Sequence, residues 1–458
     1  MNMIVPASLQ SVPFRVEDKR LIPVERYYDE EFFRLEKEKL WPRVWQMACR
    51  LEEIPNLGDY TEYTILGRSV ILVRTKSGVK AFHNACRHRG VRLATEPGNC
   101  EARGFNCPFH GWRWNIDGEN TFVFDRKAFD EDILDKAEID LAPCRIDFWG
   151  GCAFINFDDN APPLRQCLGP VADRLDARHA DRLKMDWWYG TVLPTNWKLA
   201  MEAFMDNYHV MRTHPQLYAL SPDDRPGVGG GRQLSSMTGH EAVNMTIDSR
   251  STLSEGMAGM VHHTEVAVLE KLRDMEVPSD PGAAISAFNL RAWQEIRDEA
   301  LSRGAPMFDL PKVAQEVEFH SVEYMFPHFF LLPALSAMSS YRIRPLSPET
   351  CFFEIWSLVL RPESEPYETP KRPTVLSYDS TEYPLIPRQD YSNLPLQQLG
   401  LHAGNFKHMR LSKSEEGMIS NYQRLIDGYL AGLDSKTLAN ASRIVNCGNA
   451  GDIHDIGF

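Results

Sequence analysis

Hydrophobic residues recur at helical spacing in some segments of the chain and alternate with polar residues in others. Segment 28–42 is helical in pattern, with Asp29 placed to cap its first turn and Pro42 placed to end it. From residue 45 to about residue 157, short alternating runs such as TEYTILG, SVILVRT and GCAFINF lie between Gly, Pro and Asn turns. This alternation predicts a small antiparallel β domain.

The remainder of the chain mixes helical and strand-like segments. Residues 161–170 have the composition of a linker, a helix is expected over about 195–213, and the polar segment 221–250 predicts a long surface loop. Further helices are expected near 254–276, 283–303, 387–401 and 412–432, and β-like runs at EFHSVEYMF, LSAMSSYRIRP and CFFEIWSLVLRP.

These elements together predict an α+β protein with a small antiparallel β module, followed by a larger antiparallel sheet covered by helices. We expect an N-terminal helical segment at 1–44 that packs on the later domain. The β module then occupies 45–160, and the larger domain occupies 161–458 with an insertion at about 221–310. A length of 458 residues agrees with two to four domains.

Charge and cysteine content narrow the possible partners. Lys and Arg total 50 against 63 Asp and Glu, a formal net charge of -13, which disfavours nucleic acid because phosphate binding needs a basic face. The N-terminus lacks a basic segment followed by an apolar run, and no apolar stretch reaches membrane-spanning length, so we expect a cytoplasmic protein with no membrane partner. An odd count of nine cysteines favours metal ligation over disulfides.

Two cysteines and two histidines form two short pairs that are separated by 18 residues. The first pair has the spacing Cys-x-His and the second Cys-x-x-His, and their members are Cys86, His88, Cys107 and His110. Gly and Pro beside both pairs let the backbone turn tightly around a metal. Two thiolates and two imidazoles can hold one zinc ion or one two-iron cluster.

The order of the four residues favours the iron cluster. Zinc fingers place both cysteines in one pair and both histidines in the other, whereas each pair here mixes the two types. Each loop then gives one ligand to each iron, as in a Rieske [2Fe-2S] centre. A zinc site is the alternative. Cys100 lies between the pairs without a histidine at ligand spacing, and we interpret it as a loop thiol.

A second group of polar residues follows in the expected helix 195–213. On one helix, Glu202, Asp206 and His209 share a face. His214 precedes Pro215, where the helix should end, so the His214 side chain can turn toward the same point. Two histidines and a distant carboxylate would form the facial triad of non-haem Fe(II) sites. A merely polar helix face is the alternative, but an upstream cluster that moves single electrons needs an acceptor. The four residues are Glu202, Asp206, His209 and His214.

The two motifs in this order resemble the catalytic (α) subunits of Rieske non-haem iron aromatic-ring-hydroxylating oxygenases. LEKEKLWPRVWQ, the tract 58–91 and HGWRWNIDG also resemble that family. The resemblance implies a Rieske domain at 45–160 and a helix-grip (START-like) catalytic domain at 161–458, usually in a homotrimer. Residues 221–310 match no pattern of the family.

The resemblance also implies roles for individual residues. Asp379, Glu382 and Asp390 are candidates for the third iron ligand, and PRQDYSNLPLQQLG resembles the family segment in which the ligand Asp is followed by Asn and Gln, which favours Asp390 over an N-cap role. Asp206 would connect a histidine of the mononuclear site to His110 of another chain. Glu202 would lie beside the iron or act as a more distant acid.

The expected function is that of a terminal oxygenase that uses O2 and electrons from NAD(P)H. No GxGxxG fingerprint follows a strand, so a separate reductase, with or without a ferredoxin, would supply the electrons. Either cis-dihydroxylation or monooxygenation of an apolar, aromatic or polycyclic substrate fits. A small β subunit could join the assembly. The alternatives are a demethylase or monooxygenase of a non-aromatic substrate, and a non-catalytic electron carrier or ligand-binding protein. Expected pocket residues are Phe204, Val210 and Phe329.

Overall fold

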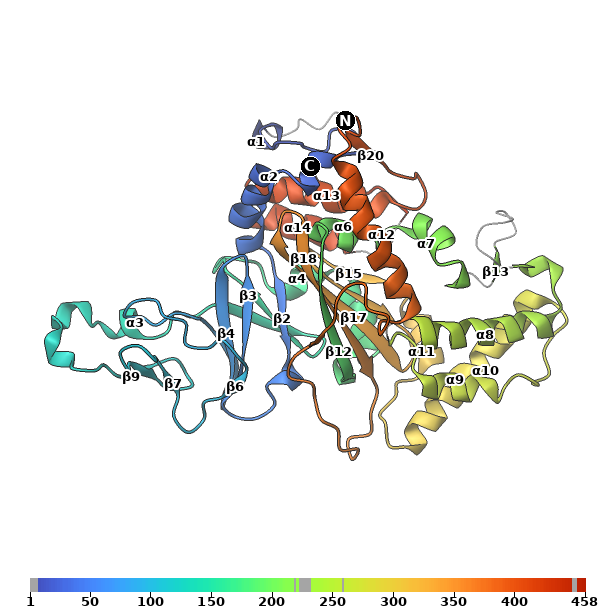
Figure 1. The fold of residues 1–458 in the computed structure, drawn as a ribbon. Helices are drawn as coiled ribbons and strands as arrows, with labels where there is room; N and C mark the ends of the chain where they lie inside the picture. Colours follow the sequence, from blue (N-terminus) through green and yellow to red (C-terminus); the bar gives the residue numbers. More distant parts are fainter. Residues whose placement is uncertain (1–6, 218–219, 222–231, 258, 447–450) are drawn as a thin grey trace. The chain divides into compact units, whose positions relative to one another are not determined.

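The computed structural model describes residues 7–217, 220–221, 232–257, 259–446 and 451–458. The chain divides into two compact units. The smaller unit is Trp41–Leu164, and the larger unit combines Met1–Leu40 with Arg165–Phe458. The N-terminal segment therefore belongs to the same unit as the C-terminal two thirds of the chain. Figure 1 shows the smaller unit in blue to cyan colours.

The smaller unit consists of three antiparallel sheets with strand orders β5-β4-β3-β6, β7-β8-β9 and β10-β11-β2. The sequence predicts these strands because inward positions alternate with outward ones: along β3, Thr61, Tyr63 and Ile65 are buried and their neighbours are not. The elements are β2 (Gln46–Arg50), β3 (Asp59–Ile65), β4 (Arg68–Thr75), β5 (Gly78–His83), β6 (Gly98–Asn99), β7 (Phe105–Asn106), β8 (Arg113–Trp114), β9 (Asn120–Phe122), α3 (Lys136–Ile139), β10 (Arg145–Trp149) and β11 (Cys152–Asn156).

The larger unit is built on a six-stranded sheet with the order β15-β16-β17-β18-β12-β19. All its pairs are antiparallel except β12 with β19. The strands are β12 (Lys184–Leu193), β15 (Glu323–Met325), β16 (Phe329–Pro333), β17 (Ala337–Ser347), β18 (Thr350–Val359) and β19 (Thr374–Val375). The short strands β1 (Leu21–Pro23) and β20 (His408–Arg410) pair separately, as do β13 (Leu220–Ser221) and β14 (Arg232–Gln233). The predicted α+β class is confirmed.

Helices cover this sheet, and α6 packs on β17 and β18 while α12 contacts α6 (Figure 1). The helices of the larger unit are α1 (Ala7–Gln10), α2 (Glu30–Leu35), α5 (Pro170–Ala177), α6 (Trp197–Glu202), α7 (Asn207–Thr213), α8 (Gly239–Gly256), α9 (His263–Glu270), α10 (Pro281–Ser302), α11 (Leu310–Glu316), α12 (Leu385–Leu401), α13 (Gly417–Leu430) and α14 (Ser435–Val445). Within the described ranges, no helix is both long and apolar enough to cross a bilayer.

The expected surface loop at 221–250 is wrong for its second half. Residues 239–250 belong to α8, and residues 222–231 lie outside the described part of the chain. A capping box starts this helix: the Thr238 side chain accepts from the Glu241 N–H, and the Glu241 carboxylate accepts from the Thr238 N–H. Helices α8, α9 and α10 share a hydrophobic core that includes Val243, Ile247, Phe288, Ala292 and Ile296. The helix was not predicted because only one of its faces is buried, so most residues of the segment are polar.

Other boundaries also differ from the expectation. The segment 161–170, which was expected to be a linker, contains the boundary between the two units and also a short helix, α4 (Leu164–Leu168). The helix expected at 254–276 is reduced to α9, and α14 was not expected at all. The buried positions of α14 recur at helical spacing, at Leu438, Ala439, Ala441, Ser442 and Val445, so its sequence contains the signal.

The expected helix at 28–42 is confirmed as a helical segment with a change of winding. The Asp29 carboxylate accepts from the Phe32 N–H at 2.7 Å and caps α2, as predicted. The next turn, Glu36–Leu40, is π-helical, and a 3-10 turn at Trp41–Arg43 ends the segment. Single π-helical turns are rare and are frequently found at functional sites.

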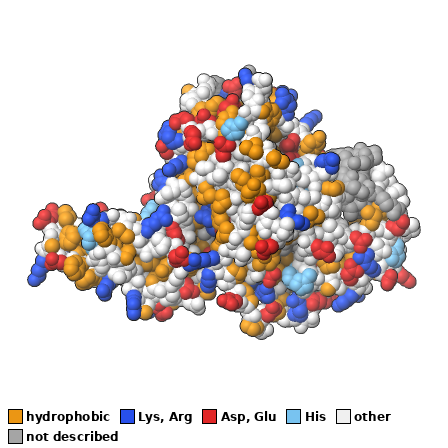
Figure 2. Space-filling model, viewed as in Figure 1, with side chains coloured by type: hydrophobic (Ala, Val, Ile, Leu, Met, Phe, Trp, Pro, Cys, Tyr) orange, Lys and Arg blue, Asp and Glu red, His pale blue; other side chains and the backbone are white. Residues whose placement is uncertain are grey.

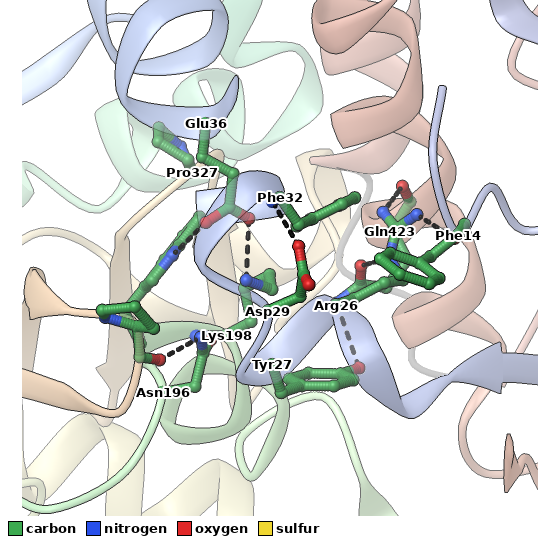
Figure 3. A network of polar contacts seen from close by, with 12 residues as sticks. Phe14, Arg26, Tyr27, Asp29, Phe32, Glu36, Asn196, Lys198, Pro327 and Gln423 are labelled. Carbon is green, nitrogen blue, oxygen red and sulfur yellow. Dashed lines mark hydrogen bonds and ion pairs between the residues drawn. The ribbon is translucent and has the colours of Figure 1, made fainter. Parts of the chain in front are cut away.

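The N-terminal segment is attached to the rest of the larger unit by buried charges. Glu36 of the π-helical turn lies 2.7 Å from the Lys198 Nζ of α6, and both side chains are fully buried. Arg26 donates to Asp427 at 2.5 Å and to the Gln423 side chain at 2.7 Å, both on α13. Figure 3 shows Glu36 directed at Lys198 and Arg26 beside Gln423. These pairs connect residues 160 to 400 positions apart in the chain.

We predict that Glu36→Ala lowers the free energy of unfolding of the larger unit by about 3–5 kcal/mol, because it leaves the buried Lys198 ammonium without a counter-charge. Urea unfolding followed by tryptophan fluorescence measures the change. The matched double variant Glu36→Leu with Lys198→Met removes both charges and should recover most of the loss. A double variant as unstable as Glu36→Ala would contradict this explanation.

Candidate metal centres

Two loops of the smaller unit repeat the same backbone arrangement. In the first, the Gly90 N–H donates to the Cys86 carbonyl at 2.8 Å; in the second, the Gly111 N–H donates to the Cys107 carbonyl at 3.0 Å. Both glycines have positive φ, +77° and +70°, which glycine adopts without strain. Each loop therefore turns tightly and presents one cysteine and one histidine at its tip.

Side chains of the same type from the two tips lie close together. The Nδ1 atoms of His88 and His110 lie 3.1 Å apart. Two nitrogen ligands at about 2.0–2.1 Å from one tetrahedral ion would be separated by roughly 3.4 Å, so both rings fit one metal. Cys86 and Cys107 are buried and contact each other. The imidazoles therefore form one close pair and the thiols another, and such pairs fit a cluster in which each iron takes one kind of ligand.

Aromatic packing orients the histidines. The His88 ring stacks on Trp112, with centroids 5.1 Å apart and planes at 9°, and meets the edge of Phe129. Burial of Trp112 in the core of the unit holds this platform in place. The sequence analysis did not single out Trp112, although it lies two residues after His110.

Cys100 lies elsewhere in the same unit. Its thiol is directed at the Gly58 carbonyl at 3.4 Å, and burial raises the pKa of Cys100 to about 12. None of the eight cysteines in the described part of the chain forms a disulfide.

In the larger unit, the single helix expected at 195–213 is wrong, because the chain breaks between α6 and α7. Asp206 leaves the helical region, with φ -117° and ψ 98°, and its carboxylate caps α7 by accepting from the His209 N–H at 3.0 Å. Glu202 ends α6 and therefore does not share one helix face with Asp206 and His209. The predicted helix end at His214 is confirmed, since His214 is the C-cap of α7.

His209, His214 and Asp390 form a cluster whose ligand atoms all lie within 4.8 Å of one another. Asp390 Oδ1 lies 2.8 Å from His214 Nε2 and 3.7 Å from His209 Nε2. Asp390 is inside α12, whose N-cap is Pro384, so Asp390 does not cap this helix. Asp379 and Glu382 are exposed and belong to no such cluster among the described residues.

The other nitrogen of each ring faces a second polar group. The His214 Nδ1 lies 2.8 Å from the Gln389 side-chain oxygen, which also accepts from Gln216. The His209 Nδ1 lies 3.3 Å from an Asp206 oxygen. An acceptor beside Nδ1 favours the tautomer that carries its hydrogen on Nδ1. The Nε2 lone pair of each ring is then available to a metal ion bound beside Asp390, as in most protein metal sites. Gln389 was missed by the sequence analysis, because only the fold brings it to His214.

Electrostatics around His209 favour its charged form. Burial by itself lowers the pKa of His209, but the carboxylates of Asp206 and Asp390 outweigh it, and the pKa lies above its ordinary value. Such an excess of negative charge around neutral donors is suited to a divalent cation. The chemistry of the cluster, two imidazoles and a carboxylate, fits non-haem iron.

A cavity of about 620 Å³ lies beside this cluster. Asp206, His209 and Asp390 line it together with Glu202. Other lining residues include Asn393, Leu394, Leu396, Gln397, Phe406, Arg410 and Glu416. The predicted pocket residues Phe204, Val210 and Phe329 are not among its lining residues within the described ranges.

Phe204 instead joins an aromatic cluster on the sheet. Its ring lies 4.2 Å from Phe330 and 5.1 Å from Tyr341, and it is half-buried while those two are fully buried. Phe329, which was predicted to line the pocket, is the neighbour of Phe330 on β16, and successive residues of a strand face opposite sides. Phe353 connects the same cluster to Tyr391, the residue after Asp390.

Two family models match this chain. A model described as the ring hydroxylating alpha subunit (catalytic domain) matches residues 173–432, more than half of the chain, and a Rieske [2Fe-2S] domain model matches residues 44–125. The chain belongs to the family of ring-hydroxylating oxygenase α subunits, which combine a Rieske [2Fe-2S] domain with a catalytic non-haem iron domain.

Curated relatives differ in the substrates that their names state. The α subunit of 2-aminobenzenesulfonate 2,3-dioxygenase from Alcaligenes sp is 34% identical over 40% of this chain and 47% of its own length. The oxygenase subunit of carnitine monooxygenase from Escherichia coli (strain K12) is 33% identical over 42% of this chain and 52% of its own length. The chain thus spans about half the length of the curated relatives that it matches.

Solved structures share the fold over nearly the whole chain. Naphthalene 1,2-dioxygenase with indole bound has a TM-score of 0.62 at 20% identity, covering 94% of this chain and 96% of that one. A quaternary ammonium Rieske monooxygenase in complex with L-carnitine has a TM-score of 0.57 at 17% identity, covering 90% and 97%. The resemblance inferred from the sequence is confirmed at the level of family and fold.

We predict that Cys107→Ser abolishes the visible absorption of the [2Fe-2S] cluster, because an iron loses a thiolate ligand. Cys100→Ser is the matched control: Cys100 is equally buried, and its loss should leave the spectrum unchanged. Absorption spectra and iron content of the purified variants measure both effects. A bleached Cys100→Ser protein beside a coloured Cys107→Ser protein would reverse the assignment.

Proposed function

We propose that this protein is the terminal oxygenase component of a Rieske-type system, which uses O2 to hydroxylate a small organic substrate. One observation carries the proposal: two imidazoles and one carboxylate converge in the larger unit of a chain whose smaller unit presents two thiols and two imidazoles. An electron carrier or a simple binding protein has no use for the first of these sites.

In this proposal, Cys86, Cys107, His88 and His110 hold the [2Fe-2S] cluster, and His209, His214 and Asp390 hold one iron. The iron, when bound, supplies the binding and reduction of O2 at open coordination positions. The protein orients the ligands: Gln389 fixes the His214 ring through its Nδ1, and Asp206 faces the His209 Nδ1.

Asp206 is also the residue that we propose for contact with another copy of the chain. It lines a cavity whose rim includes the exposed Leu396 and Phe406, so its carboxylate is reachable from outside the unit. In a homotrimer, the imidazole of His110 of a neighbouring chain would donate a hydrogen bond to the Asp206 carboxylate. Electrons would then cross between subunits.

The expected electron-transfer partners are separate proteins, because no GxGxxG fingerprint for a nicotinamide or flavin cofactor follows a strand in this sequence. Electrons would come from NAD(P)H through a separate reductase, with or without a ferredoxin, and a small β subunit would be compatible with this assembly. On the visible face of each unit, acidic and basic side chains are interspersed (Figure 2), so we propose no nucleic-acid partner. A cytoplasmic location is part of the same proposal.

For the substrate, we propose an apolar aromatic or polycyclic compound. Phe204 is the half-buried member of an otherwise buried group of rings, and Phe353 and Tyr391 extend this group to Asp390. Flat aromatic faces stack favourably with a planar ring. A substrate that packs on the half-buried face of Phe204 would thus be selected for shape and apolarity rather than for charge.

A quaternary ammonium compound is the second candidate. The relatives include carnitine and glycine betaine monooxygenases, and aromatic faces also attract such cations. In that case, hydroxylation of the carbon next to nitrogen would give an unstable amino alcohol, whose C–N bond breaks as the hydroxyl loses its proton, so the products would be a carbonyl compound and an amine rather than a cis-diol. The two candidates therefore differ in their products as well as in their substrates.

We predict that Asp390→Ala loses the mononuclear iron and all turnover but keeps the Rieske spectrum, because only the cluster in the larger unit is altered. Iron per chain should fall from about three to two. Asp379→Ala removes an exposed carboxylate close by in the sequence and is the control, with iron content and activity unchanged.

A companion variant tests Asp206. Asp206→Asn should retain the iron, the cluster and the oligomer yet lose most turnover. Loss of iron as complete as in His209→Ala would make Asp206 a ligand instead, and an active monomer would exclude electron transfer between subunits.

Product analysis decides between the two substrate classes. With a surrogate reductase, we expect conversion of flat aromatic compounds to oxygenated rings and no conversion of carnitine or betaine. Phe204→Ala should change the product ratio or the substrate range at constant iron content. Turnover confined to quaternary ammonium compounds would favour the second candidate.

A further inference from the structure

A buried acidic residue lines the cavity beside the candidate iron site without belonging to the metal cluster. Glu202 is the last residue of α6, is only 5% exposed, and lines the 620 Å³ cavity together with His209 and Asp390. Two neutral groups donate to it: the Tyr27 hydroxyl, at 3.0 and 2.9 Å from its two oxygens, and the Gln423 side-chain amide. No arginine or lysine forms a direct ion pair with it among the described contacts.

The surroundings balance the two protonation states of this group. Burial favours the neutral acid and raises the pKa of Glu202, whereas the donors Gln423 and Tyr27 and the charges of Lys198 and Arg26 favour the carboxylate. The result is a pKa of about 7. Asp206, Asp390 and Glu416 face the same cavity, and Tyr422 lies on α13 beside Gln423. Near neutral pH, Glu202 is therefore divided between an acid and a base.

The cavity offers a path for protons. A single water needs about 10–15 Å³ of such a cavity, so 620 Å³ has room for a connected group of waters. Its lining is partly polar, with Asn393, Gln397 and Arg410, and it reaches the surface at Leu396, which is 65% exposed. Water in this space can connect Glu202 both to the metal-binding residues and to bulk solvent.

We propose that Glu202 is the proton donor for the oxygenase reaction, releasing its proton to cavity water that serves the candidate iron site. The inference rests on the proposed function. Reduction of O2 with incorporation into the substrate consumes two electrons, supplied by NAD(P)H through the reductase, and two protons. The Glu202 O–H bond breaks as a water O–H bond forms, and the carboxylate later regains a proton from solvent. Glu202 itself is neither oxidised nor reduced.

This role differs from a structural one in what it predicts. A carboxyl group needed only for packing or hydrogen bonding can be replaced by the isosteric amide with no effect on the pH profile. A proton donor cannot, since the amide does not titrate. Turnover that depends on the acid form should decline as pH rises through the pKa of Glu202.

The experiment compares Glu202→Gln with Glu265→Gln in the full-length holoenzyme. Glu265 is a matched control: it is equally buried, burial also raises its pKa, and it does not line the cavity. Infrared difference spectra between pH 5 and pH 9 should show a protonated carboxyl band with a midpoint near 7 in the wild type and in Glu265→Gln, and no such band in Glu202→Gln. The band is measured without turnover, so it can fail independently of the proposed function.

Kinetics supply the second readout. Glu202→Gln should retain iron and cluster, lower turnover at least about tenfold, and lose the inflection near neutral pH. A Glu202→Gln enzyme with the wild-type band or the wild-type inflection would overturn the proposal. If Asp390→Ala retains its iron, the proposed function fails instead, whatever the infrared result.

A further variant keeps the proposal testable if Glu202→Gln does not fold. Tyr27→Phe leaves Glu202 in place but removes a hydrogen bond that favours the carboxylate. Its loss should move both the infrared midpoint and the kinetic inflection upward by about one pH unit. A variant in which neither moves, or in which only one moves, would refute Glu202 as the group that limits the reaction.

Discussion

The structure of the larger unit depends on bringing two imidazoles from one segment to a carboxylate about 180 residues away. Asp390 Oδ1 lies between the Nε2 atoms of His209 and His214, at 3.7 and 2.8 Å. The backbone must leave the α-helix before His209 and again at His214 for this to occur, and the capping carboxylate of Asp206 and the following Pro215 bring about these two exits. A continuous helix would direct the two rings to different faces, because residues five apart do not share one.

Buried polar groups hold the elements around this cluster. The N-terminal segment reaches α6 through Glu36 and Lys198, and reaches α13 through Arg26 and Asp427. Buried ion pairs add little net stability, since their desolvation offsets their attraction, but they penalise any other packing of the same elements. The same network leaves Glu202 with neutral donors only, so its charge remains free to respond to pH.

The residues that we propose as iron ligands and the aromatic rings that we propose as substrate contacts come from different parts of the larger unit. The metal cluster uses polar residues of α7 and α12, whereas the rings that extend toward it come from the sheet, with Phe330, Tyr341 and Phe353 on β16, β17 and β18.

The sequence by itself determined the features that depend on short-range spacing. The two Cys/His pairs, the Asp29 cap, the alternation of β3 and the helix end before Pro215 each involve residues within a few positions, so local geometry settles them. The family resemblance also pointed to Asp390. The tertiary structure alone decided that Gln389 meets His214, that Phe330 meets Phe204, and that Glu202 lines a cavity instead of sharing a helix face with Asp206. These contacts join segments distant in the chain, and their partners are selected by packing and burial, which act on the folded whole and leave no periodic trace in the sequence.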